Sequence, residues 1–509
     1  MTMQTNVVNV LDQIKIAQQK PFGDPRFMGV TGLEKSGTFT ESASPTSGLT
    51  FYDLELGARF LYPVLTPLRN MIPRVSGKGG IQAAWRAITA INTSGLRFGV
   101  SSANRGGVMA VTTHDYTATY KGIGIETSVD FEAQYAGQGF ADVRSIGAKT
   151  GLEALMLGEE AMILGGDADF SLGTAPTPVP VGATTGGTLL TQTESVIVVA
   201  LTLDGLMNAS VAGGIQQAIT RTNADGTTDT FGGGASYKSA NATALLTGPN
   251  ASMTASIPQV AGAMGYAWYW GLAGAEVLGA ITTINSVLIT QPATGSQTAA
   301  SLVASGGTNP STNALAFDGL IYQALTAGSN AYVAPQPTGP AGVGTPLTSD
   351  SAGGIVEIDL ALKTMWDNYR LSPDTMWVNS QEALNISKKI LMGSQTAAQR
   401  FIFESPQNML GGGIVVRTYL NRFSMQGGSV LNIEVHPNMP AGTILMTTSV
   451  LPYPLAGVGN VVQIRTRQDY YQIEWPLVTR KYQYGVYADE VLQNYFPPSL
   501  ALITNIGNG

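Results

Sequence analysis

A long stretch of very low charge divides this chain of 509 residues. From Phe170 to Phe317, 148 residues carry only seven charged side chains, while Gly, Ala, Thr and Ser are abundant. The stretch begins where an amphipathic helical pattern ends, and it stops where helix and strand patterns resume. Such a composition favours extended β structure that packs closely against other protein surfaces. The sequence therefore predicts a β-rich module, residues 170–314, inserted into a host fold.

Short strand patterns recur along this module. The expected strands are Ser195–Thr202, Ile215–Arg221, Tyr266–Gly271 and Ser286–Thr290. Asp225-Gly226 predicts a turn, and short strands at this spacing favour a β-sandwich. Asp225 and Asp229 could instead belong to a calcium loop, but they lack the ligand number and spacing of a known loop.

One segment of the module, Val260–Ile281, is apolar enough to imitate a membrane-spanning helix. Glu276 lies inside it, and its aromatic residues are central, whereas a spanning helix places them at the two interfaces. In a strand, Tyr266, Trp268 and Trp270 would share one face, because successive side chains alternate. We therefore expect a strand here and no membrane partner.

The N-terminal host segments combine an arm, a hairpin and a helix. Residues 1–60 are rich in Pro, Gly and Ser and predict an arm that is ordered only along a partner. Ala83–Ile91 and Val108–Tyr120 predict a long two-stranded excursion, with a turn signal at Asn104–Gly107. An isolated hairpin is marginal in water, so this one is expected to rest on another surface. Ala141–Leu164 predicts a long helix whose glycines allow close approach to a sheet.

After the module, a helix, a strand and a second helix indicate a compact α/β lobe. The helices are expected at Ile355–Arg370 and from Ser380, as the N-cap, to Met392, with the strand at Met376–Asn379. In the first helix, charges three and four residues apart predict ion pairs on the solvent face. These charges are Asp359, Lys363, Asp367 and Arg370.

From Gly411 onward, strand follows strand. The expected strands are Ile414–Leu420, Val430–His436, Thr443–Val450, Val461–Thr466, Tyr470–Trp475 and Tyr482–Val491. We expect a single antiparallel sheet, 411–509, against which the helix at 141–164 packs.

The sequence offers no catalytic constellation and predicts no cofactor. The absence of cysteine excludes disulfides, thiolate metal sites and thiol nucleophiles, and the two histidines, His114 and His436, lie in no metal-binding motif. A phosphate-binding loop and a nucleophile elbow are also missing. The carboxylate pairs Glu159-Glu160 and Asp489-Glu490 point apart on a helix or strand and are expected to be solvated. The N-terminus lacks the apolar run of a signal peptide, so secretion by that route is not expected.

The charges of the host are segregated. Residues 51–105 hold seven basic and two acidic residues, net +5, whereas residues 126–169 hold nine acidic and two basic residues, net −7. This segregation invites pairing between subunits, although pairing within one chain is the equally weighted alternative. The residues predicted to make intersubunit contacts are Arg86, Arg97, Arg105, Glu153 and Glu160.

Several host segments carry a resemblance to a known family. They are LTFYDLE at 49–55, LYPVLTPLRNMIPRV at 61–75, AWRAIT at 84–89, GVSSANRGG at 99–107 and DTMWVNS at 374–380. Together with the order of arm, hairpin, helix, lobe and sheet, they resemble major capsid proteins of tailed bacteriophages over roughly residues 45–165 and 315–505.

The resemblance implies the α+β fold of the Hong Kong 97-like capsid family, with an immunoglobulin-like insertion. In that fold, 1–60 would be the N-terminal arm and 61–169 the start of the peripheral domain. The latter would include an extended loop at about 75–125 and a spine helix at about 141–165. Residues 315–410 would be the axial domain, and 411–509 would complete the peripheral sheet.

The same resemblance implies self-assembly into hexamers and pentamers of a virion shell, built in the host cytoplasm around DNA that is not read by sequence. A portal is one implied partner. Because no long charged helical segment is visible, the resemblance also implies either a separate scaffolding protein or prior processing of such a segment. Lys78 and Lys121 lie in or near the extended loop, but no motif identifies a cross-link. Two alternatives remain open, an adhesin that binds through exposed Trp268 and Trp270, and an encapsulin-like compartment.

Overall fold

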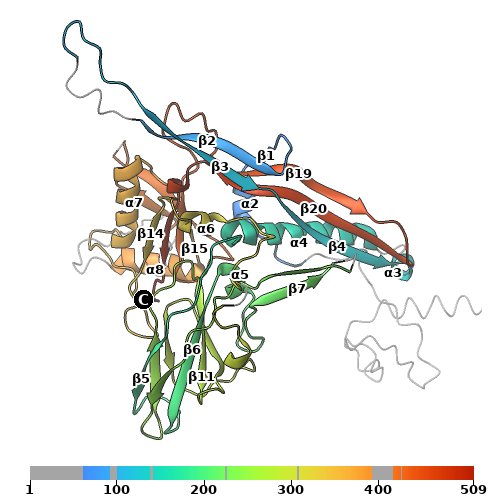
Figure 1. Cartoon of the computed structure of the whole chain (residues 1–509), viewed down its shortest axis with the longest axis vertical. Coiled ribbons are helices and arrows are strands. Elements are labelled where there is room, and N and C mark those ends of the chain that lie inside the picture. The colour runs from blue at the N-terminus through green and yellow to red at the C-terminus, as the bar shows by residue number, and fades with distance from the viewer. Residues whose placement is uncertain are drawn as a thin grey trace, which may run out of the picture. The chain divides into compact units, whose positions relative to one another are not determined.

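The computed structural model describes residues 61–91, 100–137, 141–223, 226–306, 309–392, 416–425 and 427–508. The expected arm, Arg97 and Asp225 lie outside these ranges. Residues 62–134 and those from 143 onward form one compact unit (Figure 1).

The helices are α2 (Pro67–Met71), α3 (Phe131–Ala136), α4 (Val143–Gly165), α5 (Leu203–Met207), α6 (Leu320–Leu325), α7 (Val356–Tyr369) and α8 (Ser380–Met392), with 3-10 turns η3 (Ala299–Ser301) and η4 (Pro497–Ser499). The strands of the host are β1 (Arg74–Ser76), β2 (Gln82–Ile91), β3 (Val111–Thr119), β4 (Lys121–Asp130), β14 (Tyr332–Pro335), β15 (Thr375–Val378), β16 (Thr418–Asn421), β17 (Ser429–Val435), β18 (Ile444–Thr447), β19 (Val462–Glu474), β20 (Lys481–Asn494) and β21 (Ala501–Thr504). The strands of the module are β5 (Val179–Ala183), β6 (Thr193–Leu201), β7 (Ala218–Thr222), β8 (Thr228–Gly232), β9 (Ala242–Leu245), β10 (Ser252–Ser256), β11 (Gly265–Gly271), β12 (Val277–Thr282) and β13 (Ser286–Ile289).

The long helix α4 packs on a four-stranded sheet of order β1-β19-β20-β4 (Figure 1). Glycine makes this packing close. A Cβ on Gly147 would lie 2.3 Å from the Tyr484 hydroxyl, and one on Gly151 would lie 3.2 Å from Thr127 Oγ1. The predicted close approach of helix and sheet is therefore confirmed. Tyr484 also donates a hydrogen bond to the carbonyl of Arg144, at 2.9 Å.

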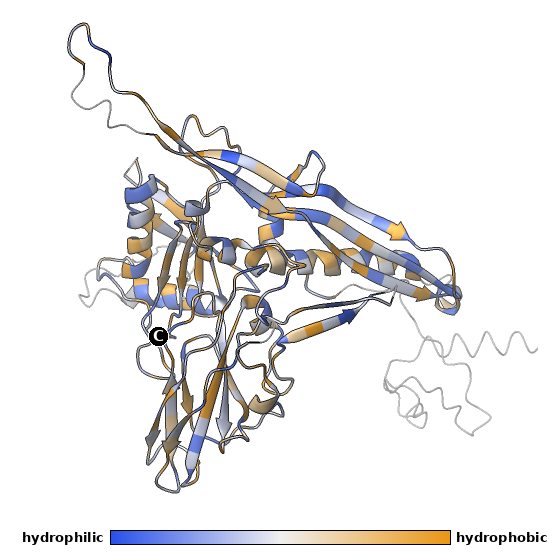
Figure 2. Ribbon diagram, viewed as in Figure 1, coloured by the Kyte–Doolittle hydropathy of each residue, from blue (hydrophilic) through white to orange (hydrophobic). Residues whose placement is uncertain are grey.

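The predicted hairpin is present as an antiparallel ribbon, β2–β3, that belongs to no larger sheet. Its base is held by buried Ala83 and by Trp85, whose ring stacks on Tyr116 at 5.7 Å. The strands end at Ile91 and resume at Val111, so the turn at 104–107 lies inside a longer connection. Figure 2 shows apolar stretches on this ribbon.

The expectation of one terminal antiparallel sheet is wrong. Only β19 and β20 join the sheet on α4, whereas β16, β17, β18 and β21 enter a six-stranded sheet of order β14-β21-β18-β15-β17-β16. That sheet is mixed, because β15 pairs with β17 in parallel and with β18 antiparallel. The α/β lobe therefore draws four of the six strands of its sheet from the segment assigned to the other domain.

The two faces of the six-stranded sheet bury different cores. Met376 and Val378 of β15 face α7 and α8, whose apolar side chains complete one cluster. Trp377, between them, faces a central cluster that includes Leu164 of α4 and Leu320 of α6. Alternation along the strand thus places the sheet between two cores.

The lobe helices lie close to their predicted bounds, with two local corrections. Lys363 and Asp367 form the expected ion pair, at 2.6 Å, but Asp359 turns toward Tyr419, which donates to it at 2.7 Å. Asn379 caps α8, because its side chain accepts from the Gln381 amide at 2.9 Å. The cap is therefore one residue earlier than predicted, and Ser380 begins the helix.

The module contains two sheets, β13-β10-β5 and β12-β11-β6-β9, that bury one shared core. Tyr266, Trp268 and Trp270 all point into this core, as predicted, while Ala267 and Tyr269 enter a second core on the opposite face of the same sheet. Burial of both faces explains why the segment is almost wholly apolar. Among the described residues, no helix is long and apolar enough to cross a membrane.

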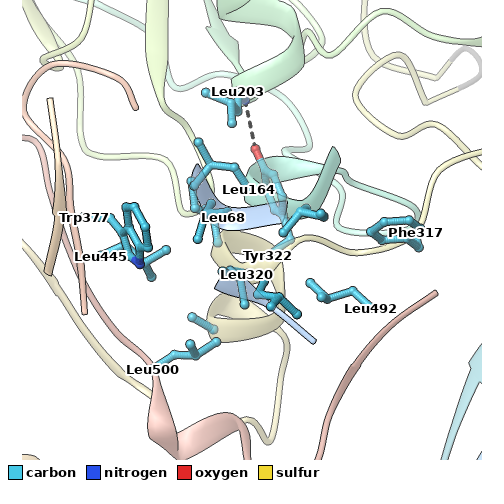
Figure 3. Close-up of a cluster of buried hydrophobic side chains, with 14 of the residues drawn as sticks. Leu68, Leu164, Leu203, Phe317, Leu320, Tyr322, Trp377, Leu445, Leu492 and Leu500 are labelled. Carbon is cyan, nitrogen blue, oxygen red and sulfur yellow. Dashed lines mark hydrogen bonds between the residues drawn. The ribbon is translucent and has the colours of Figure 1, made fainter. Parts of the chain in front are cut away.

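The module is joined to the host through the central core (Figure 3). Leu203 of α5 and Met264 belong to the module and lie in the same cluster as Leu164 and Leu320. Tyr322, fully buried on α6, accepts a hydrogen bond from the Leu203 amide at 3.2 Å. The insertion therefore shares its interior with the host.

Candidate functional site

The predicted contact residues fall into three settings. Arg86 is exposed on the ribbon and bonds Asp115 across the two strands, with Nε to Oδ1 at 2.5 Å. Arg105 is exposed in the connection between the strands, and Glu153 is half-buried on α4. The fourth described candidate, Glu160, is fully buried, which removes it from any surface contact.

The ribbon and its connection expose several large apolar side chains near Arg86 and Arg105. Exposed side chains at its base, along its strands and in its connection include Ile81, Ile88, Ile91, Val108 and Met109. Ile88 is 67% exposed and Val108 is 89% exposed. A ribbon with apolar side chains open to water on a single subunit is a surface that another molecule can cover.

Below the ribbon, a network of buried charges ties the sheet to α4. Arg74 of β1 contacts Glu159 of α4, Glu490 of β20 at 2.6 Å and Asp469 of β19 at 2.7 Å. Glu159 and Glu490 are both fully buried. The guanidinium has donors enough for several carboxylates, so one arginine joins a helix to two strands.

Arg69 and Tyr470 complete this network. Arg69 Nε donates to Tyr470 at 2.8 Å and pairs with Glu159 at 3.2 Å, and the Tyr470 hydroxyl donates to Glu159. The ring of Tyr470 also lies 4.5 Å from the Arg74 guanidinium carbon. Arg69 and Arg74 come from the basic segment and Glu159 from the acidic one, so this part of the segregated charge is paired within the chain.

Burial changes the proton affinity of the network. Burial raises the pKa of Glu490 to about 8, neighbouring Glu159 adds to the rise, and Arg74 opposes it. Arg74 contacts both Glu159 and Glu490, so its positive charge compensates for the burial of these two acidic groups.

Glu160 has a different task, which is to cap another helix. The N-cap residue of α2, Thr66, makes no side-chain cap bond, and Pro67 has no amide hydrogen. Glu160 instead accepts from the amides of Leu68, at 2.9 Å, and Arg69, at 2.7 Å. These are the free amides of the first turn, so a carboxylate from α4 satisfies the start of α2.

His436 provides the third bond to Glu160. Its Nδ1 accepts from the Asn438 amide at 3.1 Å, which leaves the proton on Nε2. Nε2 then donates to Glu160 Oε1 at 2.6 Å. The imidazole is fully buried and connects the end of β17 to α4 and α2. It is a packed residue whose hydrogen bonds are complete.

The interpretation of the two carboxylate pairs as solvated surface is wrong for three of their four members. Glu159, Glu160 and Glu490 are buried, each with a partner inside the chain. Asp489 pairs with Arg467 at 2.7 Å, so it and Glu490 do point apart as expected. The sequence held one signal for burial, the position of Glu160 on the same helical face as buried residues of α4.

The described residues do not form a catalytic or metal-binding arrangement. No group of three His, Asp or Glu side chains among them could hold a metal ion. Asp229, from the alternative calcium loop, instead bonds Arg221 at 2.9 Å. A hollow of about 230 Å³ beside α7 and β14 is lined by residues such as Asn330, Thr364 and Asn368, with no carboxylate, histidine or lysine.

The chain has been compared with known proteins. No protein-family model matches it, and no curated protein matches it in sequence. Among solved structures it resembles the capsid of a native GTA particle, at 10% identity and a TM-score of 0.42, over 92% of this chain and 100% of the other. It also resembles the capsid of Myoviridae phage XM1, at 9% identity and a TM-score of 0.37, over 93% and 100% of the two chains.

A third similar structure is the holo-SrpI encapsulin complex from Synechococcus elongatus, at 8% identity and a TM-score of 0.36, over 88% of this chain and 93% of the other. The structural neighbours are capsid proteins, together with this encapsulin. The scores and identities are low, so the function proposed below rests on features of the chain itself.

Proposed function

We propose that this chain is a major capsid protein that self-assembles into hexamers and pentamers of an icosahedral shell around double-stranded phage DNA. The observation that carries the proposal is the β2–β3 ribbon, which belongs to no larger sheet and exposes Ile88, Ile91 and Val108. A two-stranded ribbon is marginal on its own, and apolar side chains favour cover by another surface. In the shell, a neighbouring subunit supports the ribbon and covers its apolar side chains.

We assign each part of such a shell subunit to elements of the fold. In this proposal α4 with the β1-β19-β20-β4 sheet is the peripheral domain with its spine helix. The six-stranded sheet with α7 and α8 is the axial domain, and β2–β3 is the extended loop. A second ribbon, β7–β8, stands apart from the sheets of the module and offers neighbours another contact. The module itself is proposed as an immunoglobulin-like decoration of the shell.

The proposed partners are further copies of this chain, a separate scaffolding protein and a portal, with assembly in the host cytoplasm. Fewer charged residues are available for contacts between subunits than the charge segregation predicts, because Arg69, Arg74 and Glu159 are paired inside the chain. Arg86, Arg105 and Glu153 remain candidates for contacts between subunits. Any such contact between exposed groups would weaken in high salt.

The binding-module alternative loses its motivation. Trp268 and Trp270 are 0% and 4% exposed, so they cannot form an exposed platform for a glycan. An encapsulin-like compartment differs from a capsid in what it encloses, and the content of the particle distinguishes the two.

Electron microscopy of the expressed chain, with and without its scaffold, tests the proposal. We expect closed shells, and Ile88→Asp is expected to abolish them while the subunit stays folded, because Ile88 is exposed in the single chain. Ile88→Val is the matched control and should assemble. A chain that stays monomeric under all salt conditions, or an Ile88→Asp variant that assembles normally, would refute the proposal. Particles filled with protein instead of DNA would favour the compartment.

A further inference from the structure

The chain enters and leaves the module through two linkers that lie side by side, which we call the neck (residues 165–169 and 313–319). The Gly319 amide donates to the Gly166 carbonyl, and the Asn313 amide donates to the Asp167 carbonyl, both at 2.8 Å. A Cβ on Gly166 would lie 2.3 Å from the Phe317 carbonyl oxygen. The neck is therefore a tight, hydrogen-bonded joint between host and module.

Asp167 is the buried acid of this joint, with only 5% of its surface exposed. Its Oδ1 accepts from the Phe170 amide at 2.8 Å. Its Oδ2 is buried and has no hydrogen-bond partner among the described residues. An ionised carboxylate whose second oxygen is buried and accepts no hydrogen bond from the described residues is poorly stabilised.

The opposite linker brings a second acid to the same place. Asp318, half-buried, accepts from the Ala168 amide at 2.8 Å, across the neck. Asp169 is exposed on the entry linker. The nearby cation is Lys121 of β4, whose Nζ donates to the Ala314 carbonyl at 2.6 Å. Three carboxylates thus lie near one another, and Lys121 acts on one of them, Asp318.

The remaining titratable group beside Asp167 is the hydroxyl of Tyr322 on α6, which makes its hydrogen bonds to other groups. It accepts from Leu203 at 3.2 Å and donates to the Gly262 carbonyl at 3.1 Å. Asp204 of α5 also lies near this hydroxyl and adds no positive charge. No element packed on the neck within the described residues therefore supplies a free donor for Asp167 Oδ2.

We propose that the neck is a proton-controlled joint, in which a proton on Asp167 holds the module to α4 and α6, and its loss with rising pH loosens the module. The neutral acid needs no counterion in the interior. The ionised acid adds a negative charge beside Asp318 and Asp169 that Lys121 alone cannot balance. Opening of the neck hydrates the charge and relieves the repulsion.

The proton affinity of the acids agrees with this geometry. Burial raises the pKa of Asp167 to about 8, the charges of Asp318 and Asp169 add to the rise, and the amides of Phe170 and Asp169 oppose it. Burial also raises the pKa of Asp318, while Lys121 opposes that rise. Because the folded pKa of Asp167 exceeds its unfolded pKa of about 3.9, its favourable contribution is complete below that value and is lost as the pH rises through about 8.

Hydrogen exchange of the full chain as unassembled subunit, between pH 5 and pH 9, tests the joint independently of shell formation. Peptides that cover the neck are compared with a peptide from α7, after correction for the intrinsic pH dependence of exchange. Release of one proton predicts that the opening constant of the neck rises by up to about tenfold per pH unit below pH 8 and levels off above it. The α7 peptide should show no such rise.

The variants separate the proposal from a general loss of stability. Asp167→Asn keeps the shape but cannot ionise, so its neck should stay closed at pH 8 with no pH-dependent rise. Glu132→Gln, which removes an exposed acid outside the neck, is the matched control and should keep a rise like that of wild type. Asp318→Asn should move the midpoint to lower pH, because it removes a charge that favours the proton on Asp167. The proposal fails if Asp167→Asn opens like wild type, if α7 opens in parallel, or, where Asp167→Asn does not fold, if Asp318→Asn leaves the midpoint unchanged.

Discussion

Glu160 shows how one buried charge can connect three parts of a chain. Its carboxylate accepts from two amides at the start of α2 and from His436, and these three bonds replace the water that it loses. A carboxylate with three donors is among the better satisfied ions that an interior can hold. From the sequence this side chain is expected to be solvated, because neighbouring residues of a helix point apart and the Glu159-Glu160 pair converges on no site.

Glu160→Ala is therefore expected to lower the free energy of unfolding of the subunit by about 3–5 kcal/mol, because the start of α2 and His436 lose their partner. Glu160→Gln, which retains one acceptor oxygen, should cost less, about 1–3 kcal/mol. Urea denaturation of the unassembled chain measures both. Glu132→Gln is the control, since Glu132 is an exposed partner of Arg480 and its loss should have little effect. Equal effects at the two positions would contradict the buried cap.

At the scale of single elements, α4 is defined by how closely it can approach its sheet. Its glycines lower its intrinsic helical stability, yet two of them create the space for Tyr484 and Thr127. A third, Gly158, has nothing within 4 Å of a Cβ. The helix thus contains glycines that the packing requires and one that it does not.

Two alanine substitutions on this helix should have opposite signs. Gly158→Ala is expected to stabilise the subunit by about 0.5–1 kcal/mol, because alanine loses less backbone entropy and meets no neighbour. Gly147→Ala should destabilise it by about 1–3 kcal/mol, since the new methyl group would displace Tyr484. Thermal denaturation of the unassembled subunit compares them. The same sign for both would show that sheet contact does not decide the role of these glycines.

At the scale of the whole molecule, the module is more than an appended domain. Beyond the neck, a pair of buried amides fastens it to the end of the six-stranded sheet. The Asn285 amide donates to the side chain of Asn505 at 2.9 Å, and Asn505 Nδ2 donates to Asn285 Oδ1 at 3.1 Å. Gln259 also donates to Thr504, at 3.1 Å. Host and module therefore share both apolar and polar interior contacts.

We expect host and module to unfold in one transition. Asn285→Ala should lower the free energy of unfolding of the whole chain by about 1–3 kcal/mol, because it removes an acceptor of Asn505 Nδ2 and the donor to the Ile257 carbonyl in the interior. Calorimetry of the full unassembled chain is the measurement, and Asn250→Ala, at an exposed position in the module, is the control. A separate transition for the module in the wild-type chain would show that it is an independent domain.

Much of the local structure of this protein can be predicted from its sequence. Alternation identified β11 within an apolar segment, the 3.6-residue period located α4 and α7, and the charge-poor stretch marked the module. Each of these patterns arises from residues that are close together in the chain, so a short window of sequence is enough to detect it. The resemblance in the host segments added the expectation of a shell subunit.

The tertiary structure shows which strands share a sheet and which charges are buried, and neither can be predicted from the local sequence. The six strands expected after 411 look alike in sequence, yet β17 pairs with β15 in parallel while β19 leaves for the sheet on α4. Glu160 and Glu490 became interior groups because Leu68, Arg69 and Arg74, about 90 and more than 400 residues away, supply their donors. Strand pairing and burial of charge depend on contacts between segments that are far apart in the sequence. No local pattern predicts such contacts.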